Sequence, residues 1–153
     1  MSATIYDVLG DSHERQRRLC LRLTRTRAAN AQGRSDTLTE LRIELAAHAA
    51  AEERYLYAPI LMDDRGLQSA RHALSEHHDI DELVEDLQAL DPAGEAWGDT
   101  AKALAHEVRH HLKEEESKFF QISGKILTDA QKSTLAGKYQ RDFVRMRQAA
   151  TQV

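Results

Sequence analysis

The stretch HAAAEERYLY, from His48 to Tyr57, places a histidine four residues ahead of a glutamate in an alanine-rich segment typical of a helix. On a helix, residues i and i+4 are neighbours on one face, which brings the side chains of His48 and Glu52 together. The stretch HLKEEESKFF repeats this arrangement with His111 and Glu115, and in both stretches another acid follows the glutamate. Imidazole nitrogens and carboxylate oxygens are common metal ligands. The two pairs therefore raise the question of what they hold between them.

The composition predicts a helical protein of one domain. The chain has 153 residues, of which 41% are apolar and 30% are charged, and only two prolines and seven glycines interrupt it. This length is enough for one compact domain with a core and too short for two comfortable ones. Alanine, leucine, glutamate, arginine and glutamine dominate, and all of them favour helices over most other residues.

The net charge, the single cysteine and the first ten residues indicate which classes of protein can be set aside. A net charge of -4 gives no electrostatic case for binding nucleic acid or an anionic membrane. The basic residues late in the chain (Lys138, Arg141, Arg145 and Arg147) are interpreted as a solvated helix face. The single Cys20 excludes an internal disulfide and fits a reducing compartment. The start MSATIYDVLG lacks the features of a signal peptide, so we expect a soluble, cytoplasmic protein.

Breaks in the helical pattern divide the chain into five segments. Glycine, proline and small polar residues concentrate at 30–36, 62–66, 91–99 and 123–129. Helices are predicted at 3–30, 37–61, 66–90, 96–122 and 129–150. Thr37 with Glu40 and Thr128 with Gln131 match the capping-box pattern of a helix start. Pro59 is expected to kink or close the second helix.

The fold class predicted from these segments is all-α, an antiparallel up-down four-helix bundle with an additional C-terminal helix. The bundle is assigned to residues 1–125, and residues 126–153 are assigned to a helix that packs on it within the same domain. This last helix has an apolar stripe at Leu135, Tyr139, Phe143 and Met146. The stripe is expected to cover the bundle, with a partner subunit as the alternative. We expect a monomer or a weak homodimer.

The chain also repeats itself approximately. His13 and His48 are 35 residues apart, and His77 and His111 are 34 apart. Each half therefore consists of a helix with a single histidine and a helix with a histidine–glutamate pair. This pattern indicates the duplication of a helical hairpin.

Helical neighbours separate inward-facing histidines from exposed ones. The pair His111 and Glu115 continues an apolar stripe that includes Leu104, and the pair at 48 and 52 does the same in its helix. His77 has apolar face neighbours, whereas the adjacent His78 has charged ones. His13 is placed inward because it takes the position of His77 in the repeat. The histidines predicted to face solvent are His72, His78, His106 and His110.

Six residues are thus expected to meet at mid-height in the bundle: His13, His48, Glu52, His77, His111 and Glu115. A single pair of this kind is usually a helix-stabilising contact, and a single inward histidine is usually a core residue with its hydrogen bonds satisfied. Burying two carboxylates without partners is costly, however, and a metal removes that cost. Six nitrogen and oxygen ligands exceed the needs of a four-coordinate zinc ion. They suggest a dinuclear centre of iron or manganese.

At these residues the sequence resembles the hemerythrin-like proteins with the HHE cation-binding domain. The matching segments cover roughly residues 4–122: DSHERQRRL, HAAAEERYLYAPI, SEHHDIDELVEDL and RHHLKEEESKFF. The resemblance implies an antiparallel four-helix bundle that holds two iron ions in an oxo- or hydroxo-bridged di-iron centre. It also implies that Glu52 and Glu115 bridge the ions, and that the centre reacts with O2, nitric oxide or peroxide.

Two departures from the family pattern bear on the chemistry. Oxygen-carrying hemerythrins have a second histidine four residues after the third-helix ligand, where this chain has Asp81. The proline that usually follows the last motif is also missing. One iron then has an open position or a substitute ligand, and Tyr55 is the candidate, since it shares a helix face with His48 and Glu52. The alternative for Tyr55 is a core tyrosine whose hydroxyl bonds a carboxylate.

Four functions remain open at this point. The first is a di-iron protein that binds O2 or nitric oxide as a sensor, buffer or carrier. The second is an enzyme that disproportionates or reduces hydrogen peroxide, and the third is iron storage or handling. The fourth is a metal-free helical interaction module. The missing histidine favours peroxide or nitric oxide chemistry over oxygen carriage.

Overall fold

The structure is a computed structural model and describes residues 2–152. All of its regular elements are helices. In chain order they are α1 (Ile5–Arg25), α2 (Ala31–Glu52), the π-helical segment η1 (Glu53–Tyr57), α3 (Ala58–Leu61), α4 (Leu67–Gln88), α5 (Glu95–Glu114), the π-helical segment η2 (Glu115–Phe119), α6 (Phe120–Ile126) and α7 (Asp129–Thr151). Since η1 joins α2 to α3 and η2 joins α5 to α6 without a break, the chain forms five long helical stretches.

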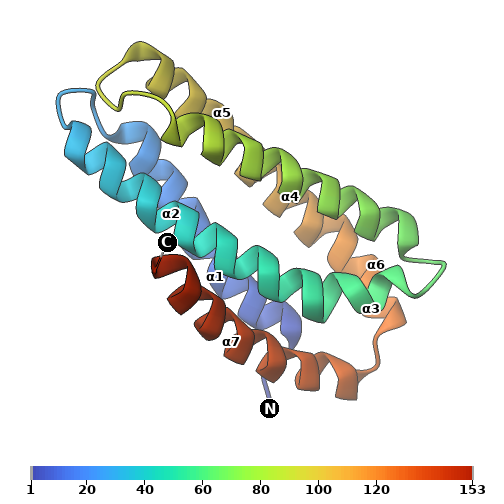
Figure 1. Ribbon diagram of the computed structural model, residues 1–153. Helices are drawn as coiled ribbons and strands as arrows, with labels where there is room; N and C mark the ends of the chain where they lie inside the picture. The colour runs from blue at the N-terminus through green and yellow to red at the C-terminus, as the bar shows by residue number, and fades with distance from the viewer. Residues whose placement is uncertain (1, 153) are drawn as a thin grey trace.

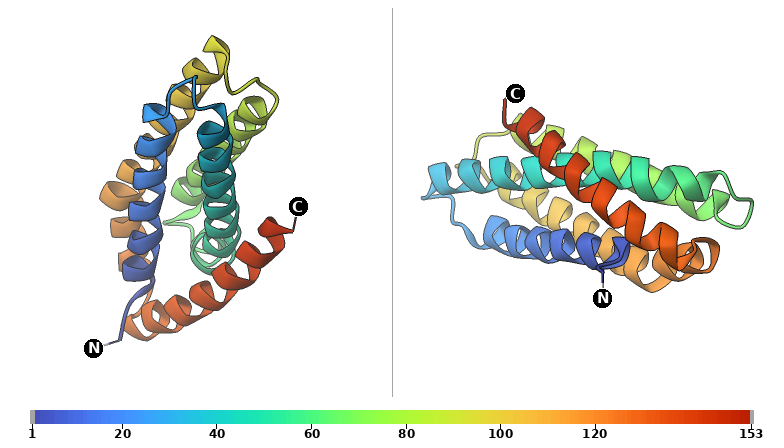
Figure 2. Two further views of the ribbon diagram at one scale, coloured as in Figure 1. Left: turned by 90° about the vertical axis from the view of Figure 1, so that its left-hand side faces the viewer. Right: turned by 90° about the horizontal axis from the view of Figure 1, so that it is seen from below.

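Four of these stretches form the predicted antiparallel bundle, and α7 lies outside it (Figure 1). Within the bundle α1 packs on α2 and α5, and α4 packs on α5. Figure 2 shows α7 crossing diagonally over α1 and α2, the two helices that it contacts most. Tyr139, in the middle of the predicted α7 stripe, is 2% exposed. The apolar stripe of α7 therefore covers the first hairpin of the bundle.

The helix starts show where turn chemistry was interpreted correctly and where it was not. The capping box of Thr128 and Gln131 starts α7 as predicted. The start predicted at Thr37 is wrong, because Asn30 caps α2 earlier by accepting a hydrogen bond from the backbone of Gly33. The Thr37 hydroxyl instead lies within the helix and donates to the carbonyl of Gly33 at 2.8 Å. Polar residues at 30–36 thus form a helical first turn rather than a loop.

The core consists of two apolar clusters separated by polar residues. One cluster includes Leu23, Leu41, Leu87 and Trp97, toward the end of the bundle where α1 joins α2. The other lies toward the opposite end, with Ile5, Leu56, Phe119 and Tyr139 among its members. On α1, α2 and α4 the inward-facing histidine falls between the residues of the two clusters. The apolar clusters therefore hold the polar layer at mid-height from both sides.

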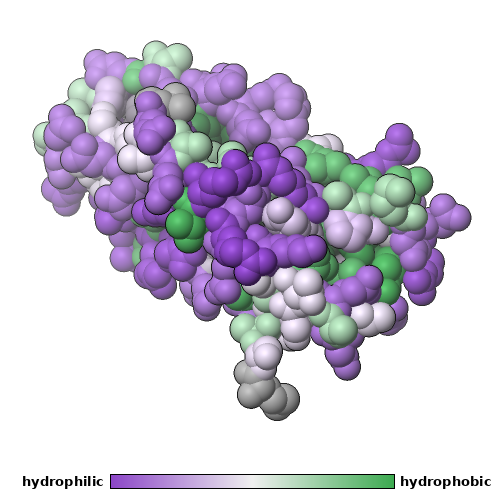
Figure 3. Space-filling view, turned by 60° about the horizontal axis from the view of Figure 1, so that its bottom comes forward, coloured by the Kyte–Doolittle hydropathy of each residue, from purple (hydrophilic) through white to green (hydrophobic). Residues whose placement is uncertain are grey.

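The outer surface is largely polar. Figure 3 views the side on which α7 lies, and hydrophilic residues cover most of this face while hydrophobic ones gather toward one end. The basic residues of α7 (Lys138, Arg141, Arg145 and Arg147) are exposed, as predicted for a solvated face. Arg145 and Arg54 both pair with the carboxylate of Asp142. Across residues 2–152, no helix has the combination of length and apolar character needed to cross a membrane.

Candidate metal centre

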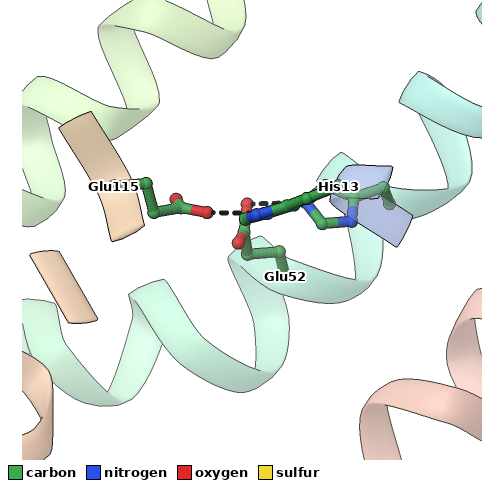
Figure 4. Close-up of side chains that lie close together, drawn as sticks. His13, Glu52 and Glu115 are labelled. Atoms are coloured by element: carbon green, nitrogen blue, oxygen red, sulfur yellow. Dashed lines mark ion pairs between the residues drawn. The ribbon is translucent and has the colours of Figure 1, made fainter. Parts of the chain in front are cut away.

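Six predicted residues meet in the middle of the bundle, and we call them the buried centre. They come from α1, α2, α4, α5 and the start of η2: His13, His48, Glu52, His77, His111 and Glu115. Each is at most 6% exposed. Figure 4 shows the side chain of Glu115 reaching across the bundle toward Glu52 and His13. The helical repeat of the sequence thus placed the whole set correctly on inward faces.

The buried centre consists of two overlapping groups of four residues, each able to hold an ion. One group contains His13 and His48, the other contains His77 and His111, and both include Glu52 and Glu115. Within each group the ligand atoms lie within 4.8 Å of one another. Each carboxylate has two oxygens, so a glutamate common to both groups can bind an ion in each. The geometry therefore fits two ions bridged by two carboxylates.

Distances within the buried centre support this arrangement. Glu52 Oε1 lies 3.2 Å from His48 Nε2 in one group and 3.3 Å from His77 Nε2 in the other. Glu115 Oε1 lies 3.2 Å from His13 Nε2, and its Oε2 lies 3.6 Å from His111 Nε2. Two ligand atoms at about 2.1 Å from the same ion are about 3–4 Å apart. The polar atoms therefore already have the separations of neighbours around an ion.

Unsatisfied polar atoms mark the same place. Five buried side-chain atoms have no hydrogen-bond partner within residues 2–152: His13 Nε2, His48 Nε2, both carboxylate oxygens of Glu52, and Glu115 Oε1. Buried polar groups are hydrogen-bonded in the great majority of cases. All five atoms belong to the buried centre and point toward its interior. The residues present therefore fit a metal, which would satisfy every one of these atoms.

The other ring nitrogen of each histidine has a partner of its own. His13 Nδ1 pairs with Glu116 at 2.7 Å, His77 Nδ1 with Glu53 at 2.8 Å, His111 Nδ1 with Glu76 at 2.9 Å, and His48 Nδ1 with the Tyr139 hydroxyl at 2.9 Å. Such partners fix the ring orientation and direct Nε2 toward a metal. All four histidines are therefore held with Nε2 facing the interior.

The ionisation of these groups reflects their close contact. Burial lowers the pKa of His13, but the carboxylates beside it, above all Glu115, outweigh burial and raise this pKa to about 9. Burial likewise lowers the pKa of His77, and Glu52 outweighs it to give about 10. Burial raises the pKa of Glu52, yet the positive charge of His48 beside it lowers this pKa well below the usual range. Without a metal, protons on His13 and His77 thus balance the buried carboxylates.

Tyr55 does not reach the buried centre, and the tyrosine that does is Tyr57. Tyr55 lies half-buried beside Lys138 and Asp142. The Tyr57 hydroxyl donates a hydrogen bond to Glu115 and lies 3.3 Å from Nε2 of His77. The prediction of Tyr55 assumed a regular α-helix after Glu52.

The physical reason for this shift is the π-helical segment η1. A π-helical turn inserts an extra residue, so the inward face moves from position i+3 or i+4 to i+5. Tyr57 is five residues after Glu52, and η1 spans Glu53–Tyr57 between them. The segment η2 follows the second histidine–glutamate pair in the same way. In both halves, therefore, a register shift begins at or directly after the glutamate that both ligand groups share.

The remaining sequence predictions concern residues outside the buried centre. Asp81 is exposed, so the side chain in place of the missing histidine does not take its role. His78 and His106 are exposed as predicted. The sequence reasoning missed Glu76 and Tyr139, which bond the ligand histidines. It noted the second acids, Glu53 and Glu116, only as a repeated pattern.

The approximate duplication extends beyond the six residues. Glu53 follows Glu52 and bonds His77 of the other hairpin, just as Glu116 follows Glu115 and bonds His13. Tyr57 packs against His77 with ring centroids 5.1 Å apart, and Phe120, at the equivalent position, stacks on His13 at 5.8 Å. The second acid and the aromatic residue of each hairpin therefore contact a histidine of the other hairpin.

The match breaks at two positions. Glu76 precedes His77 and bonds His111, whereas the equivalent residue before His13 is Ser12, which bonds Glu44 instead. The Tyr139 hydroxyl from α7 bonds His48 in place of a carboxylate. The two groups of ligands thus differ in their surroundings even though their ligand types are the same.

Comparisons with known proteins agree with this geometry. A crystal structure of a hemerythrin HHE cation-binding domain-containing protein from Mycobacterium kansasii superposes with a TM-score of 0.86 at 20% identity, covering 96% of this chain and 89% of that one. A DNA nickase from Nostoc is 32% identical over 77 residues, and the matched segment spans 50% of this chain but only 22% of that protein. Residues 4–122 match the hemerythrin HHE cation-binding domain, so this chain belongs to that family.

Proposed function

We propose that the chain is a non-haem di-iron protein whose buried centre reacts with O2, nitric oxide or hydrogen peroxide. The observation that carries this proposal is the pair of overlapping four-residue groups that share Glu52 and Glu115. Mixed imidazole and carboxylate ligands without thiolate suit iron or manganese. Bound iron would supply redox chemistry that the amino acids themselves lack.

The protein's own residues would position and enclose that chemistry. Glu52 and Glu115 would each bind both ions, while the four imidazoles would bind as neutral ligands held by their Nδ1 partners. The apolar cluster that contains Leu56 and Tyr57 lies on one side of the centre. A cavity of about 320 Å³ reaches Glu115 from the surface and is large enough for a diatomic molecule or peroxide.

Tyr57 favours peroxide chemistry as the specific activity. The Tyr57 hydroxyl donates a hydrogen bond to Glu115 inside the centre. Burial, together with the charge of Glu115, raises the pKa of Tyr57 well above its usual value, so the hydroxyl keeps its proton. Disproportionation of two peroxide molecules into O2 and two waters requires protons to move between oxygens. Tyr57 Oη can hold and return a proton at the place where these oxygens would bind.

Metal analysis and absorption spectra test the di-iron assignment. We expect about two irons per chain, with near-ultraviolet bands of an oxo-bridged ferric pair. If Tyr57 binds iron, a broad visible band will appear and will vanish in Tyr57→Phe but remain in the control Tyr55→Phe. A metal content well below two irons per chain in fresh protein would refute the di-iron centre.

The peroxide activity is tested separately. Adding hydrogen peroxide should release O2 from the unaltered protein and from His106→Ala, whose histidine is exposed, but not from His111→Ala. A stable O2 or nitric oxide adduct without peroxide turnover would instead favour a binding protein with the same centre.

A further inference from the structure

Two further histidine–glutamate pairs face each other across α4 and α5, outside the buried centre. His72 and Glu76 are four residues apart on α4, and His110 and Glu114 are four apart on α5. We call these four residues the outer cluster. The sequence reasoning placed both histidines in solvent, and their side chains are indeed 55% exposed. The two carboxylates are more enclosed, with Glu76 only 8% exposed.

Three side chains of the outer cluster, His72, Glu76 and Glu114, offer ligand atoms that all lie within 4.8 Å of one another, and His110 contacts the same two carboxylates. His72 Nε2 and His110 Nε2 each lie 3.1 Å from an oxygen of Glu114. The same two nitrogens lie 3.6 Å and 3.7 Å from Glu76 Oε2. In a tetrahedral site with bonds of about 2.1 Å, neighbouring ligand atoms are about 3.4 Å apart. The four contacts fall on both sides of that value, so an ion can lie among His72, Glu76 and Glu114, and the exposed His110 side chain can rotate to join it.

The position of Glu76 sets this cluster apart from ordinary surface ion pairs. Its Oε1 bonds His111 Nδ1 of the buried centre at 2.9 Å, while its Oε2 faces the outer cluster. The cavity of about 320 Å³ is lined by His72, Glu76 and Glu114 and also by Glu115. The outer cluster therefore lies on the wall of a cavity that Glu115 of the buried centre also lines.

A pair elsewhere on α4 shows what an ordinary contact looks like. His78 and Glu82 are also four residues apart, at 2.9 Å, and both are more than half exposed. Within residues 2–152 they join no group of three or more ligand-type side chains, whereas His72, Glu76 and Glu114 do. A single i, i+4 pair is a helix contact, but the two facing pairs place His72, Glu76 and Glu114 in one group of ligand atoms, with His110 beside it.

The fold itself does not require the outer cluster. At the equivalent positions of the first hairpin, the chain has Val8 for His72, Ser12 for Glu76, Ala47 for His110 and Ala51 for Glu114. That hairpin forms the same pair of antiparallel helices and contributes the same number of residues to the buried centre. The four ligand-type residues are thus an addition to the second hairpin alone.

We propose that the outer cluster binds a divalent transition-metal cation, such as Zn²⁺ or Fe²⁺, at the mouth of the cavity. Two imidazoles and two carboxylates form a borderline-soft set that suits these ions in tetrahedral geometry. Mg²⁺ prefers six oxygen ligands and should bind far more weakly. This site does not depend on which metal the buried centre holds.

Equilibrium dialysis of the metal-loaded protein against micromolar Zn²⁺ tests the proposal. The variants are His72→Ala/His110→Ala, which removes both exposed ligands, and Glu114→Gln, which keeps the side-chain shape. The control is His78→Ala, which removes the exposed histidine of the ordinary pair. Circular dichroism and the content of the originally bound metal establish that each variant keeps its fold and its buried centre.

We expect the unaltered protein and His78→Ala to bind one zinc per chain more than His72→Ala/His110→Ala, and Glu114→Gln to bind that zinc at least tenfold more weakly. Crystals soaked in Zn²⁺ should show an anomalous peak between His72, His110, Glu76 and Glu114. Equal zinc binding by all four proteins would overturn the proposal. So would an anomalous peak confined to the buried centre, or equal competition by Mg²⁺.

Discussion

Replacing Tyr139 with phenylalanine is expected to weaken metal binding even though Tyr139 is not a ligand. Its hydroxyl lies 2.9 Å from His48 Nδ1, on a helix beyond the residues that match the family. The substitution keeps the ring that packs in the core and removes only this oxygen. His48, which is 3% exposed, is then left with a buried nitrogen that has lost its partner.

Two independent estimates give the size of the effect. A buried polar group left unsatisfied costs about 1–3 kcal/mol. Loss of a partner that orients a metal ligand typically lowers metal affinity by about 10–100-fold, which corresponds to about 1.4–2.8 kcal/mol. The ranges agree. In a protein of this size, each kcal/mol also lowers Tm by about 2–4 °C.

Competition with a chelator of known affinity measures the loss directly. The chelator concentration needed to remove the metal should be about 10–100-fold lower for Tyr139→Phe than for the unaltered protein. Tyr55→Phe is the matched control, since this half-buried tyrosine makes no side-chain hydrogen bond that the described residues reveal. If the metal affinity of Tyr139→Phe is within about twofold of the affinities of the unaltered protein and of Tyr55→Phe, the idea that α7 orients His48 is refuted.

Four further outcomes test other parts of the structure. Glu52→Gln should lose at least one ion per chain by metal analysis, because Glu52 belongs to both ligand groups, whereas His106→Ala should lose none; equal losses would contradict the assignment. Zn²⁺ added to metal-free protein at pH 7.5 should release protons into a weakly buffered indicator solution. At that pH the imidazoles of His13 and His77, with pKa values of about 9 and 10, still hold protons that ligation must displace, so the release should fade as pH rises above about 10. Because the pKa values of His13 and His77 are raised in the folded protein, their protonation stabilises the metal-free fold, and this stabilisation is fully present below pH about 6.5. Thermal melts should show that the stabilisation is lost as the pH rises through 9 to 10. Burial raises the pKa of the Cys20 thiol to about 11, so iodoacetamide at pH 8 should modify it only on unfolding; rapid modification of native protein would show that this part of the core opens.

The four inward-facing histidines were predictable because their helices are regular α-helices up to these residues. Leu41, Leu45, His48 and Glu52 follow the α-helical repeat through α2, and the repeat therefore placed them on one inward face. After Glu52 the helix becomes π-helical, and the same rule selected Tyr55 instead of Tyr57. Nothing in local propensity marked that change, because an inserted residue is stabilised by what the shifted side chain contacts in three dimensions.

The partners of the ligands were harder to predict because they depend on contacts between distant segments. Tyr139 follows His48 by 91 residues, and only the crossing of α7 over the first hairpin brings them together. Glu53 and Glu116 were visible as second acids after each motif. Their targets lie on other helices, however, so sequence spacing alone could not assign them. The helix boundary at Asn30 failed for a simpler reason, since its polar first turn resembles a loop.

Under the proposed di-iron assignment, the duplicated hairpins explain why the two ion positions should behave differently. Both positions receive two histidines and share the same two carboxylates, so the inner ligands alone would make them alike. The outer contacts break this equivalence: one side has the Tyr57 hydroxyl and the Glu76 carboxylate, and the other has Phe120 and the neutral Tyr139 hydroxyl. A carboxylate raises the basicity of a bonded imidazole more than a phenol does. The side with His77 and His111 should therefore stabilise the more highly charged ion. It is also the side on which the outer cluster and the cavity lie. Small reactants that enter by the cavity would approach the buried centre from that side.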